Sequence, residues 1–320
     1  MKIGVAGCGA VGSFYGARLG LSGEEVHFLL RSDYETVSRD GLAVISPWGD
    51  FTFRPACARE PESIGVCDLV LIGLKTTANA HFERLLRPLA GPETVFLTLQ
   101  NGRGNEEELA RIFPPGNVMG GLCFVCLNRT APGRIHHIDH GKIVLGEHHG
   151  PPRERTRETA GLLRNAGVPC EVTGDLGRSH WEKLAWNIPF NGLGVASAAG
   201  LEAVLAGAIG AGGATWPCLT TDRLLADPRW EGLVRELMEE VVRAAGALGY
   251  SIRPGLTEKL IERTRSMGPY KASTLVDFER GHPLELESLF LEPRRRAEAA
   301  GAKVPRLAAL SDVLVALEAG

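Results

Sequence analysis

One segment, "WEKLAWNIPFN" at residues 181–191, places a cation and two amides at steps of four: Lys183, Asn187 and Asn191. Residues four apart lie on the same face of a helix, so these side chains are expected to form one polar stripe. A positioned lysine can stabilise negative charge that develops on an oxygen, and can donate the proton that completes an alcohol. Pro189 removes one backbone hydrogen bond and is expected to kink the helix. Taken alone, the stripe is also explained by a solvated helix face with a snorkelling lysine.

A glycine-rich turn lies near the start of the chain, in "KIGVAGCGAVGSF". It follows an apolar strand at 2–6, precedes a helix at 10–19, and contains the pattern GxGxxG. In this context the glycines permit a tight turn, the close approach of a pyrophosphate, and close packing of the helix on the strand. The helix N-terminus would face the phosphates with its unpaired N–H groups. The expected residues of this dinucleotide site are Gly7, Gly9, Ala10, Val11 and Gly12.

The residue that ends the second strand, at 26–31, selects the cofactor. An acidic residue there would bind the ribose 2′-hydroxyl of NAD. This chain has Arg31 followed by Ser32, and a guanidinium matches a 2′-phosphate with its forked donors. The sequence therefore predicts NADP (NADPH). Asp33 leaves an alternative open, because it could be a helix cap or could bind the ribose of NAD.

Two later strands, at 68–75 and 94–101, also end in polar residues. Lys75 ends "DLVLIGLK", and Asn101 ends "TVFLTLQN" just before Gly102. In open sheets of this type, ligands bind outside the carboxyl ends of the strands. We therefore expect Lys75 and Asn101 to face the cofactor, with Asn101 presenting its amide to the nicotinamide or its ribose.

The elements that must position these residues fall into two groups. Strands at 2–6, 26–31, 42–46, 68–75 and 94–101 alternate with several helical stretches, and this alternation predicts a parallel, doubly wound sheet. After residue 117 the pattern predicts short strands joined by turns, then a helix at 153–167 and a strand at 169–174. Further helices are expected at 176–198, 201–207, 229–248, 254–265, 270–279, 284–300 and 306–318. The predicted fold class is α/β, with a Rossmann-type NADP-binding domain at 1–173 and an all-helical substrate domain at 174–320.

Composition excludes several classes of protein. A net charge of −3 argues against a partner that is nucleic acid or an anionic membrane, because both favour a strongly basic surface. The chain shows no signal peptide or membrane span, since the Gly/Ala-rich run at 192–216 lacks sustained Leu, Ile, Val and Phe. We expect a cytoplasmic protein. The seven scattered cysteines do not form a disulfide framework.

Two local clusters invite a metal or redox site, but simpler interpretations are favoured. Cys123 and Cys126 form a single CxxC in an apolar strand, where small core residues are expected. His136 and His137 are adjacent on an expected strand and so point to opposite faces, while His140 is expected in a turn. No metal site is predicted, and the histidines are assigned to a solvated hairpin.

Together, the GxGxxG turn with Arg31, the strand-end lysine, the "QNG" turn, the "WEKLAWN" helix and "KASTLVDFERGHPLELES" resemble the ketopantoate reductase (2-dehydropantoate 2-reductase) family. The resemblance covers nearly the whole chain. It implies NADPH-dependent reduction of ketopantoate to (R)-pantoate, in pantothenate and coenzyme A biosynthesis.

The resemblance also implies roles for individual residues. Lys183 matches the general acid, and Lys75 and Asn101 match residues on the cofactor side. Substrate contacts are implied for Asn187, Asn191, Ser273 and Glu285, with Asp277 in support. Without the resemblance, Asp277 and Glu285 could be solvated helix charges and Ser273 a helix cap.

Three alternatives remain at this stage. The segment around Ser273 and Glu285 departs from the family pattern in two places: at "AST", and at Phe290, near a position where asparagine is frequent. Another 2-keto acid is therefore an alternative substrate. A related dehydrogenase that oxidises a 3-hydroxy acid would also use a Lys-x-x-x-Asn helix. A non-catalytic NADP-binding sensor would not need Lys183. The resemblance suggests a monomer or a homodimer.

Overall fold

The computed structural model describes residues 1–210 and 213–319. The chain divides into two compact units, Met1–Leu176 and Gly177–Gly320, and each is described by itself. The sequence placed the boundary at 173. In both units the elements follow from the apolar periodicity of the sequence, with turns at glycines.

In the described part of the first unit, ten strands form one sheet with the order β4-β3-β9-β8-β7-β6-β1-β2-β5, and β10 pairs with β9. The strands are β1 (Lys2–Ala6), β2 (Glu25–Leu29), β3 (Leu42–Ile45), β4 (Phe51–Phe53), β5 (Ala56–Ala58), β6 (Leu69–Ile72), β7 (Val95–Thr98), β8 (Val118–Ala131), β9 (Arg134–Glu147) and β10 (Cys170–Val172).

Six adjacent strands, from the edge strand β5 through β2, β1, β6 and β7 to β8, are parallel. Chain order reverses beside β1, which has β2 on one side and β6 on the other. This is the switch point at which open α/β sheets bind ligands. The predicted Rossmann-type fold class is confirmed.

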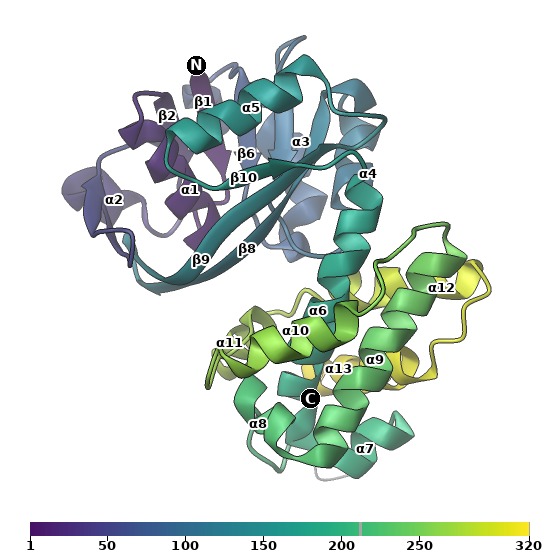
Figure 1. Cartoon of the computed structure of the whole chain (residues 1–320). Helices are drawn as coiled ribbons and strands as arrows, with labels where there is room; N and C mark the ends of the chain where they lie inside the picture. The colour runs from purple at the N-terminus through teal and green to yellow at the C-terminus, as the bar shows by residue number, and fades with distance from the viewer. Residues whose placement is uncertain (211–212, 320) are drawn as a thin grey trace. The chain divides into compact units, whose positions relative to one another are not determined.

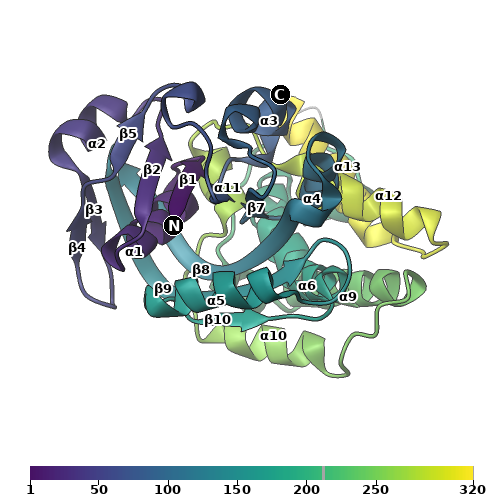
Figure 2. The ribbon, with the colours of Figure 1, turned by 90° about the horizontal axis from the view of Figure 1, so that it is seen from above.

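The prediction of short strands after residue 117 was wrong. β8 and β9 are two strands of 14 residues each, paired antiparallel along their length, and Figure 2 shows them side by side. Register shifts interrupt the ladder at Phe124/Val125, Cys126/Leu127 and Arg129/Ala131. Such bulges break the alternation of apolar and polar residues, so the sequence looks like several pieces.

Helices cover both faces of this sheet. One face packs on α1 (Ala10–Leu21) and α5 (Glu154–Asn165), and the other on α3 (Phe82–Leu86) and α4 (Asn105–Ile112). Figure 1 shows α5 lying along the sheet beside β10. The remaining helical segments are α2 (Tyr34–Asp40) and 3₁₀ turns at Pro61–Ser63, Thr76–His81, Arg87–Leu89 and Pro115–Asn117.

The described residues of the second unit form helices joined by turns and loops, and no strand is found among them. Its helices are α6 (Leu176–Ala196, which starts at the last residue of the first unit), α7 (Leu201–Ala206), α8 (Thr221–Ala226), α9 (Pro228–Ala247), α10 (Leu256–Arg265), α11 (Ser273–Glu279), α12 (Glu292–Ala299) and α13 (Pro305–Ala319), with a 3₁₀ turn at Ser197–Ala199 and a π-helix at Glu287–Leu291. The sequence missed α8. The helix expected at 284–300 begins with the π-helical turn.

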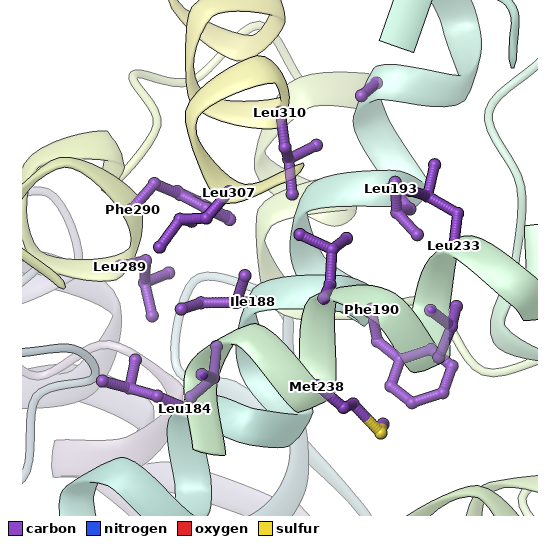
Figure 3. Close-up of a cluster of buried hydrophobic side chains, with 14 of the residues drawn as sticks. Leu184, Ile188, Phe190, Leu193, Leu233, Met238, Leu289, Phe290, Leu307 and Leu310 are labelled. Atoms are coloured by element: carbon purple, nitrogen blue, oxygen red, sulfur yellow. The ribbon is translucent and has the colours of Figure 1, made fainter. Parts of the chain in front are cut away.

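α6 is the centre of this unit. Figure 3 shows its apolar side chains meeting those of α9, the π-helix and α13, including Leu184, Ile188, Phe290 and Leu310. A Cβ on Gly192 would lie 2.6 Å from Leu310 Cδ2, so a small residue is needed there for α13 to approach. Part of the Gly/Ala-rich run at 192–216 therefore packs closely, although residues 211 and 212 of that run lie outside the described residues. Across those described, no helix is long and apolar enough to cross a membrane.

The histidine and cysteine clusters are largely structural. His136 is exposed and His137 is buried, on opposite faces of β9 as predicted. His137 packs against Phe14 and Trp48, with Nδ1 2.8 Å from Ser46 Oγ. His140 does not lie in a turn: it is within β9 at a bulge, with φ 64. Cys123 and Cys126 are buried cysteines in β8.

Candidate active site

In the first unit, four strands end at the same level of the sheet. Ala6 pairs with Leu29 on one side and Ile72 on the other, and Ile72 pairs with Thr98. The backbone N–H of Gly73 then donates to Ala6 O at 2.8 Å, and that of Leu99 donates to Ile72 O at 2.8 Å. The segments that carry Gly7, Arg31, Lys75 and Asn101 therefore leave the sheet along one edge, at the carboxyl ends of parallel strands.

The three glycines of the turn have different surroundings, so the absence of a side chain has a different consequence at each. Gly7 has φ +92, and a Cβ there would lie 2.2 Å from Leu74 N. A Cβ on Gly12 would lie 2.3 Å from Gly7 O, which shows how closely the helix packs on the turn. A Cβ on Gly9 would meet nothing within 4 Å, so Gly9 leaves open space rather than a tight protein contact. That space is where a pyrophosphate approaches in dinucleotide sites of this type.

The N-terminus of α1 is also suited to bind the pyrophosphate. Gly9 is the N-cap residue without a side-chain cap, and the first turn contains no acidic residue. The N–H groups of Ala10, Val11 and Gly12 precede the first intrahelical donor, Ser13 N, which donates to Gly9 O. The helix dipole adds partial positive charge at this end. The residues present therefore fit a bound dinucleotide.

Gly73 was missed by sequence reasoning. A Cβ on Gly73 would lie 2.9 Å from both Gly7 O and Gly12 N, so this position must be small for β6 to pass the glycine turn. The signal was available as the glycine in "LVLIGLK", at a strand end next to the predicted turn.

Arg31 and Asp33 follow β2 but have different surroundings. Arg31 is exposed and has no hydrogen-bond or ion-pair partner among the described residues. Asp33 is buried and accepts hydrogen bonds from Arg129, Gly133 N and Ser32 Oγ. Burial raises the pKa of Asp33, but these donors outweigh it and hold the pKa below its usual value. Asp33 precedes α2 without capping it by its side chain.

A hydrogen-bonded chain of amides supports the segments after β6 and β7. Gln100 Nε2 donates to Asn79 Oδ1 at 2.8 Å, and Asn79 Nδ2 donates to Asn105 Oδ1 at 2.9 Å. Asn105 Nδ2 then donates to the backbone O of Asn101 at 3.0 Å. The chain therefore ties the turn at Asn101 to the 3₁₀ segment that follows Lys75.

Asn79 and Asn105 are support residues that sequence reasoning did not identify. Each lies among other polar residues, so neither stands out in the sequence, and only the fold brings the two together. Thr98 completes the chain at its other end, with its hydroxyl donating to Gln100 Oε1 at 2.9 Å.

In the second unit, the predicted stripe lies on α6. The helix is continuous through Pro189 for 21 residues. Lys183 is half-buried, and Asn187 and Asn191 are buried, which contradicts a fully solvated face. Asn187 is 6% exposed, yet its side-chain amide makes no hydrogen bond to another described residue. Neither amide atom is among the fully buried polar atoms that lack a partner, so the amide remains accessible to a ligand or to water.

The stripe contacts the start of α11. Asn191 Oδ1 accepts hydrogen bonds from Ser273 Oγ at 3.2 Å and from Thr274 N at 3.0 Å. The N-cap position of α11 is Ala272, which cannot cap through its side chain. Asn191 therefore satisfies a backbone donor of α11 from outside that helix. Two predicted substrate residues are brought together.

Two acidic residues of the second unit are buried. Asp277 and Glu285 have exposed fractions of 8% and 5%, so neither is an ordinary solvated helix charge. His282 N donates to Asp277 O at 2.9 Å and ties the end of α11 to the segment before Glu285. Ser288 is also buried and was not identified from the sequence. It lies within the π-helix, a distortion that frequently marks functional positions.

Phe290 does not belong with these polar residues. Its side chain is fully buried in the core cluster of the second unit, as Figure 3 shows. A Cβ on Gly192 would lie 2.9 Å from Phe290 Cε1. The departure from the family pattern at this position is therefore accommodated by packing against α6.

A Rossmann-type sheet with a dinucleotide turn, together with a helical unit that carries a Lys-x-x-x-Asn stripe, defines a class of nicotinamide-dependent oxidoreductases. The chain matches the family "Ketopantoate reductase PanE/ApbA" over residues 3–150. It matches "Ketopantoate reductase PanE/ApbA C terminal" over residues 203–318. The chain belongs to the ketopantoate reductase family.

Named relatives and solved structures are similar to this chain over almost its full length. A 2-dehydropantoate 2-reductase of Nostoc sp. is 38% identical over 312 residues, covering 96% of this chain and 92% of its own length. The crystal structure of 2-dehydropantoate 2-reductase from Geobacter metallireducens has 43% identity and a TM-score of 0.90, with 99% of each chain covered. The Methylococcus capsulatus structure of that name has 35% identity and a TM-score of 0.85, covering 100% of this chain and 97% of its own.

Proposed function

We propose that this chain catalyses the NADPH-dependent reduction of 2-dehydropantoate to pantoate in the cytoplasm. The observation that carries the proposal is the stripe on α6, in which the side-chain amide of Asn187 is accessible and makes no hydrogen bond to another residue that the structure describes, and Asn191 is bonded to Ser273. This is a polar binding face beside Lys183, in a chain whose relatives are named for this reaction.

In this proposal the first unit binds the cofactor and the second unit binds the substrate. Gly7, Gly9, Ala10, Val11 and Gly12 hold the pyrophosphate through open space and backbone N–H groups. Lys75 and Asn101, which leave the same edge of the sheet, contact the ribose and nicotinamide. When bound, the nicotinamide cofactor supplies the hydride.

The preference for NADPH rests on Arg31. Its exposed guanidinium has no described partner and can form forked hydrogen bonds to a 2′-phosphate. Asp33, the residue that could bind the ribose of NAD, already accepts hydrogen bonds on both of its carboxylate oxygens.

Lys183 is the general acid. As hydride adds to C2 of the keto acid, the electrons of the carbonyl move onto its oxygen, and the Lys183 ammonium stabilises that charge. The ammonium then transfers a proton to the oxygen, which gives the alcohol and neutral lysine. Asn187 donates a hydrogen bond that holds the substrate near this cation.

Ser273 and Glu285 bind the two ends of the substrate. The Ser273 hydroxyl hydrogen can rotate, so it can exchange Asn191 for the substrate carboxylate. Glu285 accepts a hydrogen bond from the substrate hydroxyl. Asn191 positions Ser273 through the hydrogen bond described above and fixes the start of α11.

The test is steady-state NADPH oxidation with 2-dehydropantoate, a panel of other 2-keto acids, and NADH in place of NADPH. We expect preference for 2-dehydropantoate and NADPH. Lys183→Ala should lower kcat by roughly 10²–10⁴ while NADPH binding is kept. Lys259→Ala, which removes an exposed lysine of α10, is the control and should change neither.

Other outcomes assign other functions. Turnover only with a different keto acid would overturn the substrate and keep the chemistry. NADPH binding without turnover of any keto acid or 3-hydroxy acid would overturn the enzyme assignment and favour a sensor.

A further inference from the structure

We propose that Arg129 is a determinant of cofactor specificity: by holding Asp33 in an ion pair, it prevents that carboxylate from repelling the 2′-phosphate and from binding the ribose of NADH. The inference rests on the proposed function, because it assumes that the nucleotide binds beside Arg31. It concerns a residue 96 positions away from Asp33, on β8.

The carboxylate of Asp33 is held by four donors. Arg129 approaches it with two guanidinium nitrogens, Nε to Oδ2 at 2.8 Å and Nη2 to Oδ1. Gly133 N donates to Oδ2 at 3.0 Å, and Ser32 Oγ donates to Oδ1 at 3.0 Å. Each oxygen therefore accepts two hydrogen bonds from the protein, which leaves little capacity for a pair of ribose hydroxyls.

The position of Asp33 makes its charge important. It lies two residues after Arg31, at the carboxyl end of β2, where NAD-binding proteins of this fold place an acidic residue for the ribose. An unpaired carboxylate there would favour NADH and would repel a dianionic phosphate. The lowered pKa of Asp33 keeps this group charged at neutral pH, so pairing is what neutralises it.

The fold places Arg129 for this contact. Arg129 lies near the end of β8, at the register shift Arg129/Ala131, beside the turn into β9. Such a shift changes the direction of a side chain relative to the regular ladder. Gly133, in the same turn, has φ +65 and supplies the backbone donor. The tip of the β8–β9 hairpin thus reaches the end of β2.

The test measures equilibrium binding of NADPH and NADH by calorimetry, without any keto acid, together with kcat/KM for both cofactors. Arg129→Ala and the milder Arg129→Gln should raise the Kd for NADPH by about tenfold, the scale of one uncompensated charge near a protein surface. The Kd for NADH should stay the same or fall. Arg129→Lys should retain part of the NADPH preference.

The decisive variant is the double substitution Arg129→Ala with Asp33→Asn. It removes both charges, so NADPH binding should return to within a few fold of the parent. A purely structural role for Arg129 does not predict this rescue, because the double variant still lacks both hydrogen bonds from Arg129 to residue 33. Asp33→Asn alone should keep NADPH binding.

Arg155 offers a matched control. It contacts the buried carboxylate of Glu147 with Nε at 3.1 Å and with Nη2, and Thr156 supplies a hydroxyl donor as Ser32 does for Asp33. Arg155→Ala should lower the melting temperature by breaking a comparable pair, but should leave the ratio of the two Kd values unchanged.

Two results would overturn the inference. One is an unchanged NADPH-to-NADH ratio in both Arg129→Ala and Arg129→Gln. The other is an equal loss of both cofactors that Asp33→Asn does not rescue. If the parent protein itself binds neither cofactor, the proposed function fails instead, and the two failures are therefore distinguishable.

Discussion

The hydroxyl of Ser273 donates a hydrogen bond to Asn191 Oδ1 at 3.2 Å, although the two residues are 82 positions apart in the chain. The same oxygen accepts the backbone N–H of Thr274. One amide of α6 thus fixes both a proposed substrate-binding hydroxyl and the first turn of α11, so local stability and substrate affinity should be linked at this residue.

Asn191→Ala should lower both the stability of the protein and its affinity for the substrate. Thr274 N is buried, and leaving it unsatisfied should cost about 1–3 kcal/mol of unfolding free energy. The KM for the keto acid should also rise, because Ser273 is no longer positioned. Ser273→Ala is the comparison: it should raise KM with a smaller loss of stability. Denaturant unfolding and kinetics measure both quantities, and equal stability losses in the two variants would contradict the assignment.

Substitutions in the glycine turn should separate folding from cofactor binding. Gly9→Ala adds a methyl group to open space, so the melting temperature without cofactor should hardly change while the Kd for NADPH rises. Gly12→Ala would place its Cβ 2.3 Å from Gly7 O, so it should destabilise the protein even without cofactor. If Gly9→Ala leaves NADPH binding intact, the pyrophosphate does not approach there.

The hydrogen-bonded chain of Gln100, Asn79 and Asn105 should hold the turn at Asn101 in place. Asn79→Ala removes hydrogen bonds to Gln100 and Asn105. We expect it to weaken NADPH binding severalfold and to destabilise the protein by about 1–3 kcal/mol, because buried polar partners are left unsatisfied. The control is Asn117→Ala, which loses an exposed hydrogen bond to Pro92 O; it should leave the Kd for NADPH unchanged.

The cysteines should be poor nucleophiles near neutral pH. Burial raises the pKa of Cys67 and of Cys170 to about 11. Because only the thiolate reacts, each should have roughly 100-fold less reactive species at pH 8 than a thiol of ordinary pKa. Residue-specific alkylation, read by mass spectrometry, should show rates that rise with pH up to about 11. Rapid labelling of either residue in the folded protein at pH 7 would contradict this.

Much of the fold could be predicted because its elements are local and periodic. The turn between β1 and α1 follows from three glycines after an apolar strand, and α6 and α9 follow from their apolar faces. The β8–β9 hairpin could not be read correctly, because its bulges and His140, at positive φ, interrupt the alternation. The two strands continue through these interruptions because they pair with each other, and this pairing cannot be predicted from either segment alone.

For the site, sequence reasoning found residues that carry recognisable chemistry in a fixed local order. It did not find residues whose role is to hold others. Arg129, Asn79 and Asn105 act across long stretches of sequence, and their types are common on protein surfaces. Asp33 could not be assigned either, because its availability depends on Arg129, which only the folded hairpin brings to it.

The level at which β1, β2, β6 and β7 end determines where the chain tolerates insertions and deletions. A deletion of one residue within β6 would turn its following side chains to the opposite face and move Lys75 relative to Gly7. The turn at Gly23 lies at the other end of β2, and a Cβ there meets nothing within 4 Å. A peptide tag inserted at Gly23 would thus leave the four strand ends level, whereas the same tag within a strand would separate them.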